Sequence, residues 1–440
     1  MEGFPFPPFV GFLILVTTNH KLFKMKKLAL TLLVLFISCQ SNNKNEFENK
    51  VISEIKKTDI PAVVMGKIHK SGQMDFYSFG PSRWERNDTI SEKDLFWIAS
   101  MTKVITSVAG MQLVDKGIIS LDEPLDIYLP EMTEIPILND DFELVKAKQK
   151  ITLRHLLTHS SGFGNKNSHP KMVEWEKIKD NYDWKYLYPF PRMFESGKSY
   201  LYGISTSWLG ILIERLTKMS LADYMKENLF IPMEMNNTFF EYDMTDKQTE
   251  MLVSSSQRNL KTRKLEKKEP KNDLFNDWDY FKNIVPDYKY SGQGSINSTP
   301  EDFGKFMQIF LNKGTYKNHV ILSEKSLQEF ISPQLNGYKI EFWDDEVEGG
   351  FDFSGRGDLN HFFDEYDNHS LGMAYEEQSK SRPIGSGYWA GAWNSYFMVD
   401  FQNEFGIVYM TQIRDFNDVY SYNLFTSFER LIYEDIKNLD

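Results

Sequence analysis

A serine and a lysine three residues apart, Ser100 and Lys103, form the pattern in this chain with the most evident chemistry. The apolar run Phe96–Ala99 precedes the serine, and the residues after it predict a helix that continues to about Asp115. Residues three apart in a helix share a face, so a serine in the first turn would lie beside the lysine. A poorly hydrated lysine can lose its proton and take one from the hydroxyl, and the helix N-terminus would stabilise an oxyanion. The spacing therefore favours a nucleophilic Ser100.

The Ser-x-x-Lys pattern alone is weak, because polar stretches meet it by composition. It recurs at Ser41/Lys44, Ser53/Lys56 and Ser168/Lys171. Ser100 differs in its setting: the approach is apolar, and the following helix is predicted to be amphipathic, with apolar residues at Val104, Val108, Met111 and Val114.

The composition of the chain limits its class and its partners. The 440 residues are 41% hydrophobic and 25% charged, which is typical of one large globular domain or two intertwined ones. The net charge of −12 argues against nucleic acid as a partner, because phosphate binding needs basic patches. The one basic run, Arg258–Lys271, contains glutamates and predicts a solvated hairpin or loop.

The first part of the chain has the layout of a secretory signal. Met25-Lys26-Lys27 is basic, Leu28–Ile37 is apolar, and the only cysteine, Cys39, closes the segment before a polar stretch. This resembles a bacterial lipoprotein signal, in which cleavage before Cys39 leaves a lipidated N-terminus. The alternative is an ordinary membrane helix, for which the run is short. We expect translation to start at Met25 and the protein to be a periplasm-facing, lipid-anchored membrane lipoprotein of the bacterial cell envelope.

Strand patterns at both ends of the chain surround a predominantly helical middle. Residues 60–79, 395–400 and 406–412 predict strands, whereas Ser205, Thr299-Pro300 and about 422 begin predicted helices. This arrangement predicts an α/β domain interrupted by a helical one. The expected division is 1–38 over-extended start and signal, 39–50 linker, 51–115 with 290–440 α/β domain, and 116–289 mainly helical domain. The acidic, aromatic stretch Asn336–Asn368 predicts a long functional or disordered loop.

Four further stretches follow Ser100 in a particular order. They are Ile151–Gly162, Phe194–Ser205, Ser291–Asp302 and Tyr388–Phe397. With Ser100-x-x-Lys103 they resemble the serine β-lactamase and penicillin-binding-protein superfamily, in its class C-like branch of esterases, D-aminopeptidases and carboxypeptidases. The resemblance spans about residues 60–412. It implies an antiparallel sheet flanked by helices, with an inserted mainly helical domain, and no cofactor.

The resemblance also implies a role for individual residues. Ser100 would be the acylated nucleophile, Lys103 its partner, and Tyr202 the general base and acid. The stretch Trp389, Ala390 and Gly391 stands where many members have Lys-Thr-Gly and would line the substrate site. The backbone N–H groups of Ser100 and Ala392 would form the oxyanion hole.

Two assignments have alternatives. Tyr316-Lys317-Asn318 and Tyr366-Asp367-Asn368 match the family's Tyr-x-Asn more literally, but only Tyr202 leads directly into a predicted helix. His155 and His159 are spaced for one helix face and could bind a metal, although no His-Glu-x-x-His pattern accompanies them. We therefore prefer Tyr202 and expect no metal.

Two departures from the family pattern bear on the substrate. Ile204 replaces the asparagine of Tyr-x-Asn, and Trp389 replaces the lysine of Lys-Thr-Gly. Losing a charge-assisted contact to a substrate carboxylate costs about 1.5–3 kcal/mol. We therefore expect a serine hydrolase that acts on small-molecule esters. Its alternatives are a D-amino-acid peptidase or carboxypeptidase acting on D-amides or peptides, a weak β-lactamase, or a non-catalytic sensor of wall fragments or lactams.

Overall fold

The computed structural model describes residues 46–166, 168–259, 261–268, 277–340, 367–378, 381–414 and 416–439. The predicted signal segment with Cys39 lies outside these residues, as do residues 341–366 of the predicted Asn336–Asn368 loop. Within the described ranges, no helix combines the length and the apolar character needed to cross a membrane.

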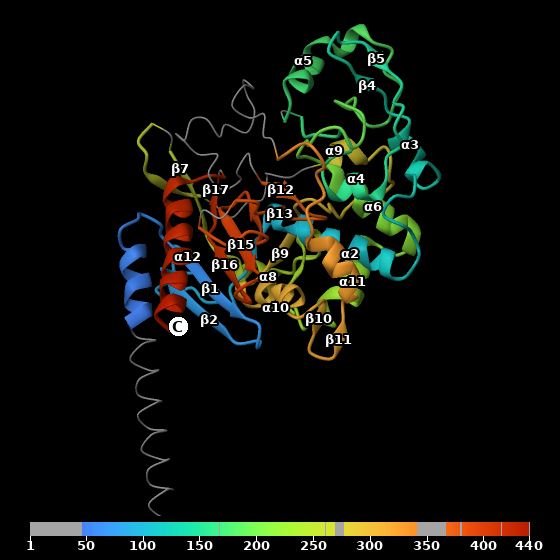
Figure 1. The fold of residues 1–440 in the computed structure, drawn as a ribbon. Coiled ribbons are helices and arrows are strands. Elements are labelled where there is room, and N and C mark those ends of the chain that lie inside the picture. Colours follow the sequence, from blue (N-terminus) through green and yellow to red (C-terminus); the bar gives the residue numbers. More distant parts are fainter. Residues whose placement is uncertain are drawn as a thin grey trace, which may run out of the picture.

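Both ends of the chain contribute to one seven-stranded antiparallel sheet (Figure 1). Its strand order is β12-β13-β14-β15-β16-β1-β2, and β1 pairs with β16 so that Val64 lies opposite Met410. The strands are β1 (Val63–His69), β2 (Met74–Phe79), β12 (Asn368–His369), β13 (Ala374–Tyr375), β14 (Gly387–Gly391), β15 (Ser395–Asp400) and β16 (Phe405–Met410). The antiparallel sheet and the N-terminal strand pair are confirmed.

Helices cover both faces of this sheet. Phe303 of α10 (Pro300–Leu311) lies 5.1 Å from Phe397, and Phe425 of α12 (Val419–Leu439) lies 5.3 Å from Tyr396, measured between ring centroids. Neighbouring strand residues point to opposite faces, so the two helices lie on opposite sides of β15. As a result, every residue of β15 and β16 is buried. Thr299 caps α10, accepting from the Asp302 amide at 3.1 Å, as the sequence predicts.

The helix that follows Ser100 runs through the interior. The short 3-10 turn η1 (Ala99–Met101) leads into α2 (Thr102–Asp115), which contacts α6 (Ser205–Thr217) and α11 (Glu324–Ile331). Every residue of α2 from Thr102 to Leu113 is buried. The predicted amphipathic character was therefore wrong, because the polar positions of this helix face other protein elements rather than water.

The middle of the chain is a mixture of short helices and short strands. Its helices are η2 (Leu125–Ile127), α3 (Pro130–Thr133), α4 (Leu153–Leu157), α5 (Pro170–Ile178), η3 (Lys179–Asn181), α6, α7 (Leu221–Met225), η4 (Lys226–Phe230), η5 (Glu241–Asp243), α8 (Asp246–Met251) and α9 (Trp278–Phe281). Its strands are β4 (Ile137–Leu138), β5 (Leu144–Val145), β6 (Phe239–Phe240), β7 (Ser255–Arg258) and β8 (Leu265–Lys268). The domain boundaries given above remain predictions.

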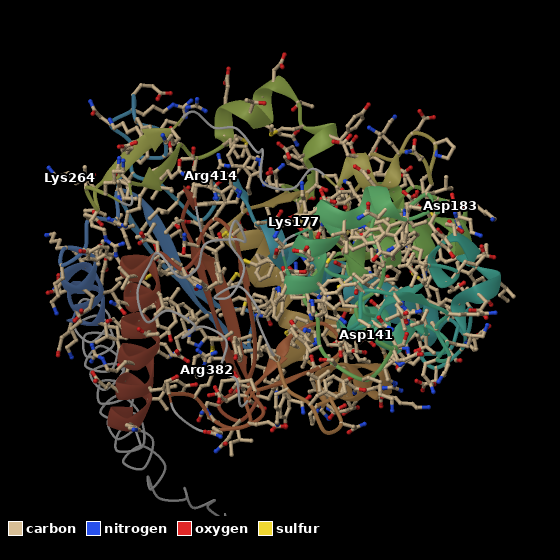
Figure 2. All side chains as sticks on the ribbon, turned by 90° about the horizontal axis from the view of Figure 1, so that it is seen from above. Asp141, Lys177, Asp183, Lys264, Arg382 and Arg414 are labelled. Carbon is tan, nitrogen blue, oxygen red and sulfur yellow. The ribbon has the colours of Figure 1, made fainter. Side chains whose placement is uncertain are left out.

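Small sheets connect this middle part to the rest. Strand β3 (Phe96–Trp97), which leads to Ser100, pairs with β9 (Ile296–Ser298), and β9 pairs with β6. Strands β7 and β8 form a hairpin whose turn and second strand lie in the basic run, and β17 (Ile413–Arg414) pairs with β7. The predicted hairpin is present, but β7 is mostly buried rather than solvated. Lys264 in this hairpin and Asp183 near α5 lie at opposite ends of the molecule (Figure 2). A further hairpin joins β10 (Thr315–Tyr316) to β11 (His319–Val320).

Candidate active site

Ser100, Lys103 and Tyr202 converge in the structure. The Lys103 ammonium group donates to Ser100 Oγ at 3.1 Å, and the Tyr202 hydroxyl donates to the same oxygen at 2.7 Å. Lys103 Nζ also lies 4.7 Å from the centroid of the Tyr202 ring. Of the alternative tyrosines, Tyr316 lies in the β10–β11 hairpin, and Tyr366 lies outside the described residues. The family resemblance, with the place of Tyr202 before a helix, thus selected three side chains that meet around one hydroxyl.

The backbone presents Ser100 in an unusual turn. Ser100 belongs to η1, directly before α2, rather than to the first turn of an α-helix as predicted. The preceding Ala99 has a φ of 46°, a left-handed conformation that residues with a Cβ rarely adopt. Such strain is typical of functional sites, where the surrounding structure maintains it. Ser100 is only 7% exposed, so a substrate must reach a confined hydroxyl.

Lys103 is buried and bonded to a backbone carbonyl. Its side chain is 1% exposed, and Nζ donates to the Gln293 carbonyl oxygen at 2.9 Å. Burial lowers the pKa of Lys103 to about 7, while the nearby negative charge of Asp277 opposes this shift. A substantial fraction of the amine is therefore unprotonated at neutral pH and can accept a proton from Ser100.

The end of strand β14 closes one side of the site. A Cβ built on Gly391 would lie 2.3 Å from the Ile98 carbonyl oxygen, so this strand touches the segment that leads into Ser100. Trp389 and Ala390 are buried in the same strand, and the Trp389 ring lies 5.7 Å from the Tyr202 ring. Ala392 begins the turn to β15. The predicted lining strand thus lies beside the segment that leads into Ser100, whereas the oxyanion role of Ala392 remains a prediction.

A cluster of aromatic and imidazole rings surrounds Tyr202. The His159 ring lies 5.0 Å from Tyr202, 5.6 Å from His369 and 6.4 Å from Trp389, centroid to centroid. Burial lowers the pKa of His159 well below its usual range and that of His369 to about 4, so both rings are neutral at pH 7. Sequence reasoning missed His369 in β12, because no local pattern distinguishes it.

The two histidines considered as metal ligands have different environments. His159 belongs to the ring cluster, and its carbonyl accepts from the Leu201 amide at 2.8 Å. His155 instead helps to cap α4, where its Nδ1 accepts from the Thr152 amide at 3.1 Å. His159 therefore packs beside Tyr202, whereas His155 stabilises the first turn of α4.

Comparison with known proteins identifies the family. The model of the family described as Beta-lactamase matches residues 47–425, most of the chain. The chain belongs to the beta-lactamase family. The acyltransferase mokF of Monascus pilosus is 26% identical over 63% of this chain and 68% of its own length. The lovastatin esterase of Penicillium rubens is 30% identical over 33% of this chain and 40% of its own length. Relatives of this beta-lactamase-family protein therefore include acyltransferases and esterases.

Solved structures share the fold at low sequence identity. A mutant of simvastatin synthase from Aspergillus terreus superimposes with a TM-score of 0.72 at 22% identity, covering 89% of this chain and 95% of that one. EstCE1, described as a hydrolase with promiscuous acyltransferase activity, gives a TM-score of 0.64 at 16% identity, covering 88% and 99%. At these identities the likeness establishes the beta-lactamase-type fold.

The cation that Trp389 replaces is not supplied by Arg382. Of the two basic residues nearest before β14 in the sequence, Lys380 lies outside the described residues. The Arg382 guanidinium is buried and donates from Nε to Glu429 Oε1 at 2.9 Å. It is thus bound within the protein and is not available to a substrate carboxylate.

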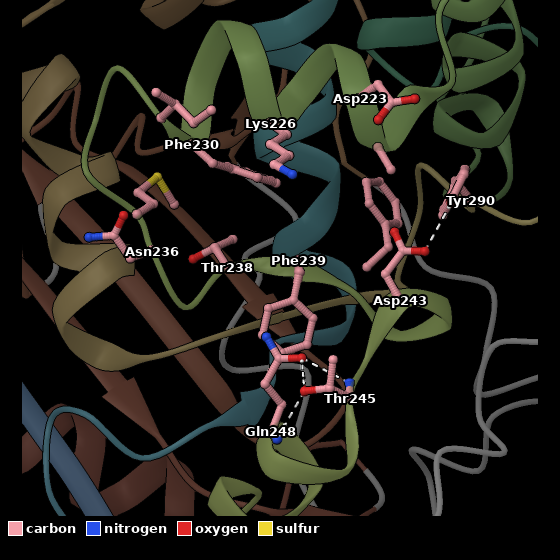
Figure 3. A pocket seen from close by; sticks show the side chains of 14 residues that line it. Asp223, Lys226, Phe230, Asn236, Thr238, Phe239, Asp243, Thr245, Gln248 and Tyr290 are labelled. Carbon is pink, nitrogen blue, oxygen red and sulfur yellow. Dashed lines mark hydrogen bonds between the residues drawn. The ribbon is translucent and has the colours of Figure 1, made fainter.

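A separate cavity lies away from the nucleophile. It has a volume of about 510 Å³ and is lined by residues of α7, η4, β6, η5 and α8 (Figure 3). Tyr290 donates to Asp243 across its wall at 3.1 Å. Ser100, Lys103 and Tyr202 are not among its lining residues, so it is not the site of the chemistry discussed above.

Replacing Gly391 by alanine should disturb the turn that carries Ser100. The new Cβ would collide with backbone at 2.3 Å, and a displacement of about 1 Å at a reacting group can cost a hundredfold in rate. We expect Gly391→Ala to lower kcat/KM on a chromogenic ester about a hundredfold. Gly387→Ala in the same strand is the matched control, because its Cβ would meet the flexible Met373 side chain at 2.8 Å. Equal activities of the two variants would contradict this account.

Proposed function

We propose that the protein is a serine acyl-transfer enzyme that hydrolyses small-molecule esters through an acyl group bound to Ser100. The observation that carries the proposal is the cluster around Ser100 Oγ, with Lys103 Nζ at 3.1 Å and the Tyr202 hydroxyl at 2.7 Å. A hydroxyl is a weak nucleophile until a neighbouring base takes its proton. A buried lysine with a pKa of about 7 is suited to that task at neutral pH.

The reaction has two balanced halves. In the first, Ser100 Oγ attacks the ester carbonyl while its proton passes to the Lys103–Tyr202 pair, which then protonates the departing alcohol. In the second, water attacks the acyl group, loses its proton to the same pair, and Ser100 recovers a proton as the acid leaves. The backbone amides of Ser100 and Ala392 would stabilise the oxyanion in both halves.

The lining of the site favours uncharged acyl groups. Trp389 stands where a lysine would bind a carboxylate, and the nearby His159 and His369 rings are neutral at pH 7. Ile204, which replaces the amide-binding asparagine, is buried. These features support an ester substrate over a penicillin, a D-amide or a peptide, and the complete Ser100, Lys103 and Tyr202 set disfavours a non-catalytic sensor.

Transfer to an alcohol is the second candidate function. The Monascus pilosus relative is named as an acyltransferase, and a further relative as the monacolin J acid methylbutanoyltransferase of Aspergillus terreus. Transfer needs the same acyl group on Ser100 and differs only in whether water or an alcohol attacks it. The two functions therefore differ in the molecule that accepts the acyl group, and both use the same proposed nucleophile.

A covalent probe tests the proposed nucleophile. A fluorophosphonate should label wild-type protein on the peptide that contains Ser100, and Ser100→Ala should abolish labelling and ester turnover. Removal of a nucleophile from such a unit typically costs several orders of magnitude in kcat. Ser205→Ala is the matched control, since Ser205 is a buried serine that bonds Ser161 at 2.9 Å. Labelling of Ser161 or Ser205 in the wild-type protein would disprove the assignment.

The substrate preference can be ranked directly. We expect kcat/KM for short-chain esters to exceed that for penicillins and D-Ala-D-Ala peptides by at least tenfold, because a lost charge-assisted contact costs about 1.5–3 kcal/mol. Trp389→Lys should narrow this difference. Steady-state rates with the three substrate classes provide the measurement, and the reverse ranking would mean that another group binds the carboxylate.

We also propose that the protein is a lipid-anchored lipoprotein of the bacterial cell envelope. The proposal rests on the basic start at Met25, the apolar run Leu28–Ile37 and the single cysteine at its end. Several acyl chains bind a membrane firmly, since each buried CH₂ contributes about 0.8 kcal/mol.

Loss of the cysteine should release the enzyme. In a bacterial host that processes lipoproteins, Cys39→Ala should move the protein out of the membrane fraction with kcat/KM unchanged, as judged by fractionation, immunoblot and ester assay. Ser38→Ala is the control that keeps the lipidation residue. A Cys39→Ala protein that stays in the membrane would indicate an uncleaved apolar anchor instead.

A further inference from the structure

A buried carboxylate lies behind the catalytic cluster. Asp277 is 4% exposed, and its Oδ2 accepts hydrogen bonds from four uncharged groups. The donors are Ser207 Oγ at 2.6 Å, Ser291 Oγ at 2.7 Å, Tyr288 Oη at 3.0 Å and Gln293 Nε2 at 3.3 Å. Burial raises the pKa of this carboxyl, whereas the four hydrogen bonds lower it because they stabilise the charged form. Donors gathered on one oxygen indicate a site built for a carboxylate.

Gln293 connects this carboxylate to Lys103. Its side-chain amide donates to Asp277, and its backbone carbonyl accepts from Lys103 Nζ at 2.9 Å. Ser291 adds a second connection, because its hydroxyl donates to Asp277 and accepts from the backbone N–H of Gln293 at 3.4 Å. Asp277 therefore holds the segment that presents a carbonyl to the catalytic amine.

The other side of the cluster is attached to the same carboxylate. Ser207 lies in the first turn of α6, the helix that follows Tyr202. Helix α2 is bonded to the loop Ser291–Gln293 through Thr106, whose hydroxyl donates to the Gly292 carbonyl at 2.8 Å. A Cβ on Gly292 would lie 2.4 Å from the Thr206 carbonyl, so the loop and the two helices leave no room to shift.

We propose that Asp277 is a positioning residue that holds the Gln293 carbonyl in place and thereby keeps Lys103 Nζ against Ser100 Oγ. This inference rests on the proposed function and deepens it. Asp277 itself does not touch Ser100. It fixes the position of the Lys103 amine through Gln293. Its negative charge also partly offsets the effect of burial on that amine.

The pH dependence of activity distinguishes this role from a purely structural one. The titratable groups around the Lys103 amine are Tyr202, His159 and Asp277, of which His159 is neutral at pH 7. Burial lowers the pKa of Lys103, and the Asp277 charge raises it. The unprotonated amine is the active form, so activity falls as the pH drops through this pKa. Removing the Asp277 charge lowers the pKa further and must move the acidic limb of kcat/KM to lower pH.

The experiment compares Asp277→Asn with Asp400→Asn. Asp400 is also a buried carboxylate, and it accepts from Tyr433 at 2.8 Å. It ends β15, whereas Ser395 at the other end of this strand pairs with Gly391 beside the site. With a p-nitrophenyl ester between pH 5 and 9, Asp277→Asn should lower kcat about tenfold, leave KM within about twofold, and shift the acidic limb down by about half a unit or more. Asp400→Asn should change none of these. The proposal would be overturned if Asp277→Asn kept the wild-type kcat and the wild-type acidic limb of the pH profile. It would also be overturned if both variants lost kcat equally and neither moved the acidic limb.

Two further variants complete the test. Ser100→Ala is measured alongside: if it retains turnover, the proposed function fails, whereas an inactive Ser100→Ala with a wild-type Asp277→Asn refutes the positioning role alone. If Asp277→Asn does not fold by circular dichroism, Ser291→Ala replaces it. That variant removes one donor from the Gln293 loop, so kcat should fall about threefold with KM unchanged. An unchanged kcat would contradict the proposal.

Discussion

The burial of the Lys103 amine is the constraint on which the site depends. An ammonium group in the interior is unfavourable unless it is neutralised or bonded, and here burial lowers its pKa to about 7. The amine belongs to the first turn of α2, a helix that is buried along most of its length. The Gln293 carbonyl and Ser100 Oγ then become the partners that replace water. One buried amine thus connects a helix, a loop and the Ser100 hydroxyl.

Close backbone contacts keep this arrangement rigid. Ala99 is held in a left-handed conformation, and the end of β14 approaches it so closely that Gly391 has no space for a side chain. Gly292 has the same role between α2 and α6. These segments come from distant parts of the sequence, so the tight contacts also join the seven-stranded sheet to the helices. The strain before Ser100 is maintained because no neighbouring segment can move to relieve it.

Sequence patterns selected the three side chains that meet around Ser100 Oγ, but they did not predict their surroundings. Ser100, Lys103 and Tyr202 follow the family order, and the choice of Tyr202 depended on its place before a helix. The helix after Ser100 was wrongly predicted as amphipathic, because apolar spacing does not reveal that its polar residues also face protein. His369 and Asp277 had no local signal. The contacts of His369 with His159 and of Asp277 with Ser207 join segments far apart in the sequence, which a local pattern does not reveal.

The identity of residue 389 links the substrate to the base. Only the Tyr202 ring separates position 389 from Lys103, since Trp389 contacts Tyr202 and Tyr202 contacts the amine. A lysine at position 389 would therefore lie near the Lys103 amine. A second cation would lower the pKa of Lys103 further by repulsion. Because Trp389 and the two nearby histidines are uncharged, the pKa of Lys103 depends mainly on burial, which lowers it, and on the Asp277 charge, which raises it. A tryptophan at position 389 would therefore remove a binding group for a substrate carboxylate and also leave fewer charges near the Lys103 amine, which links the proposed preference for uncharged esters to the proposed mechanism.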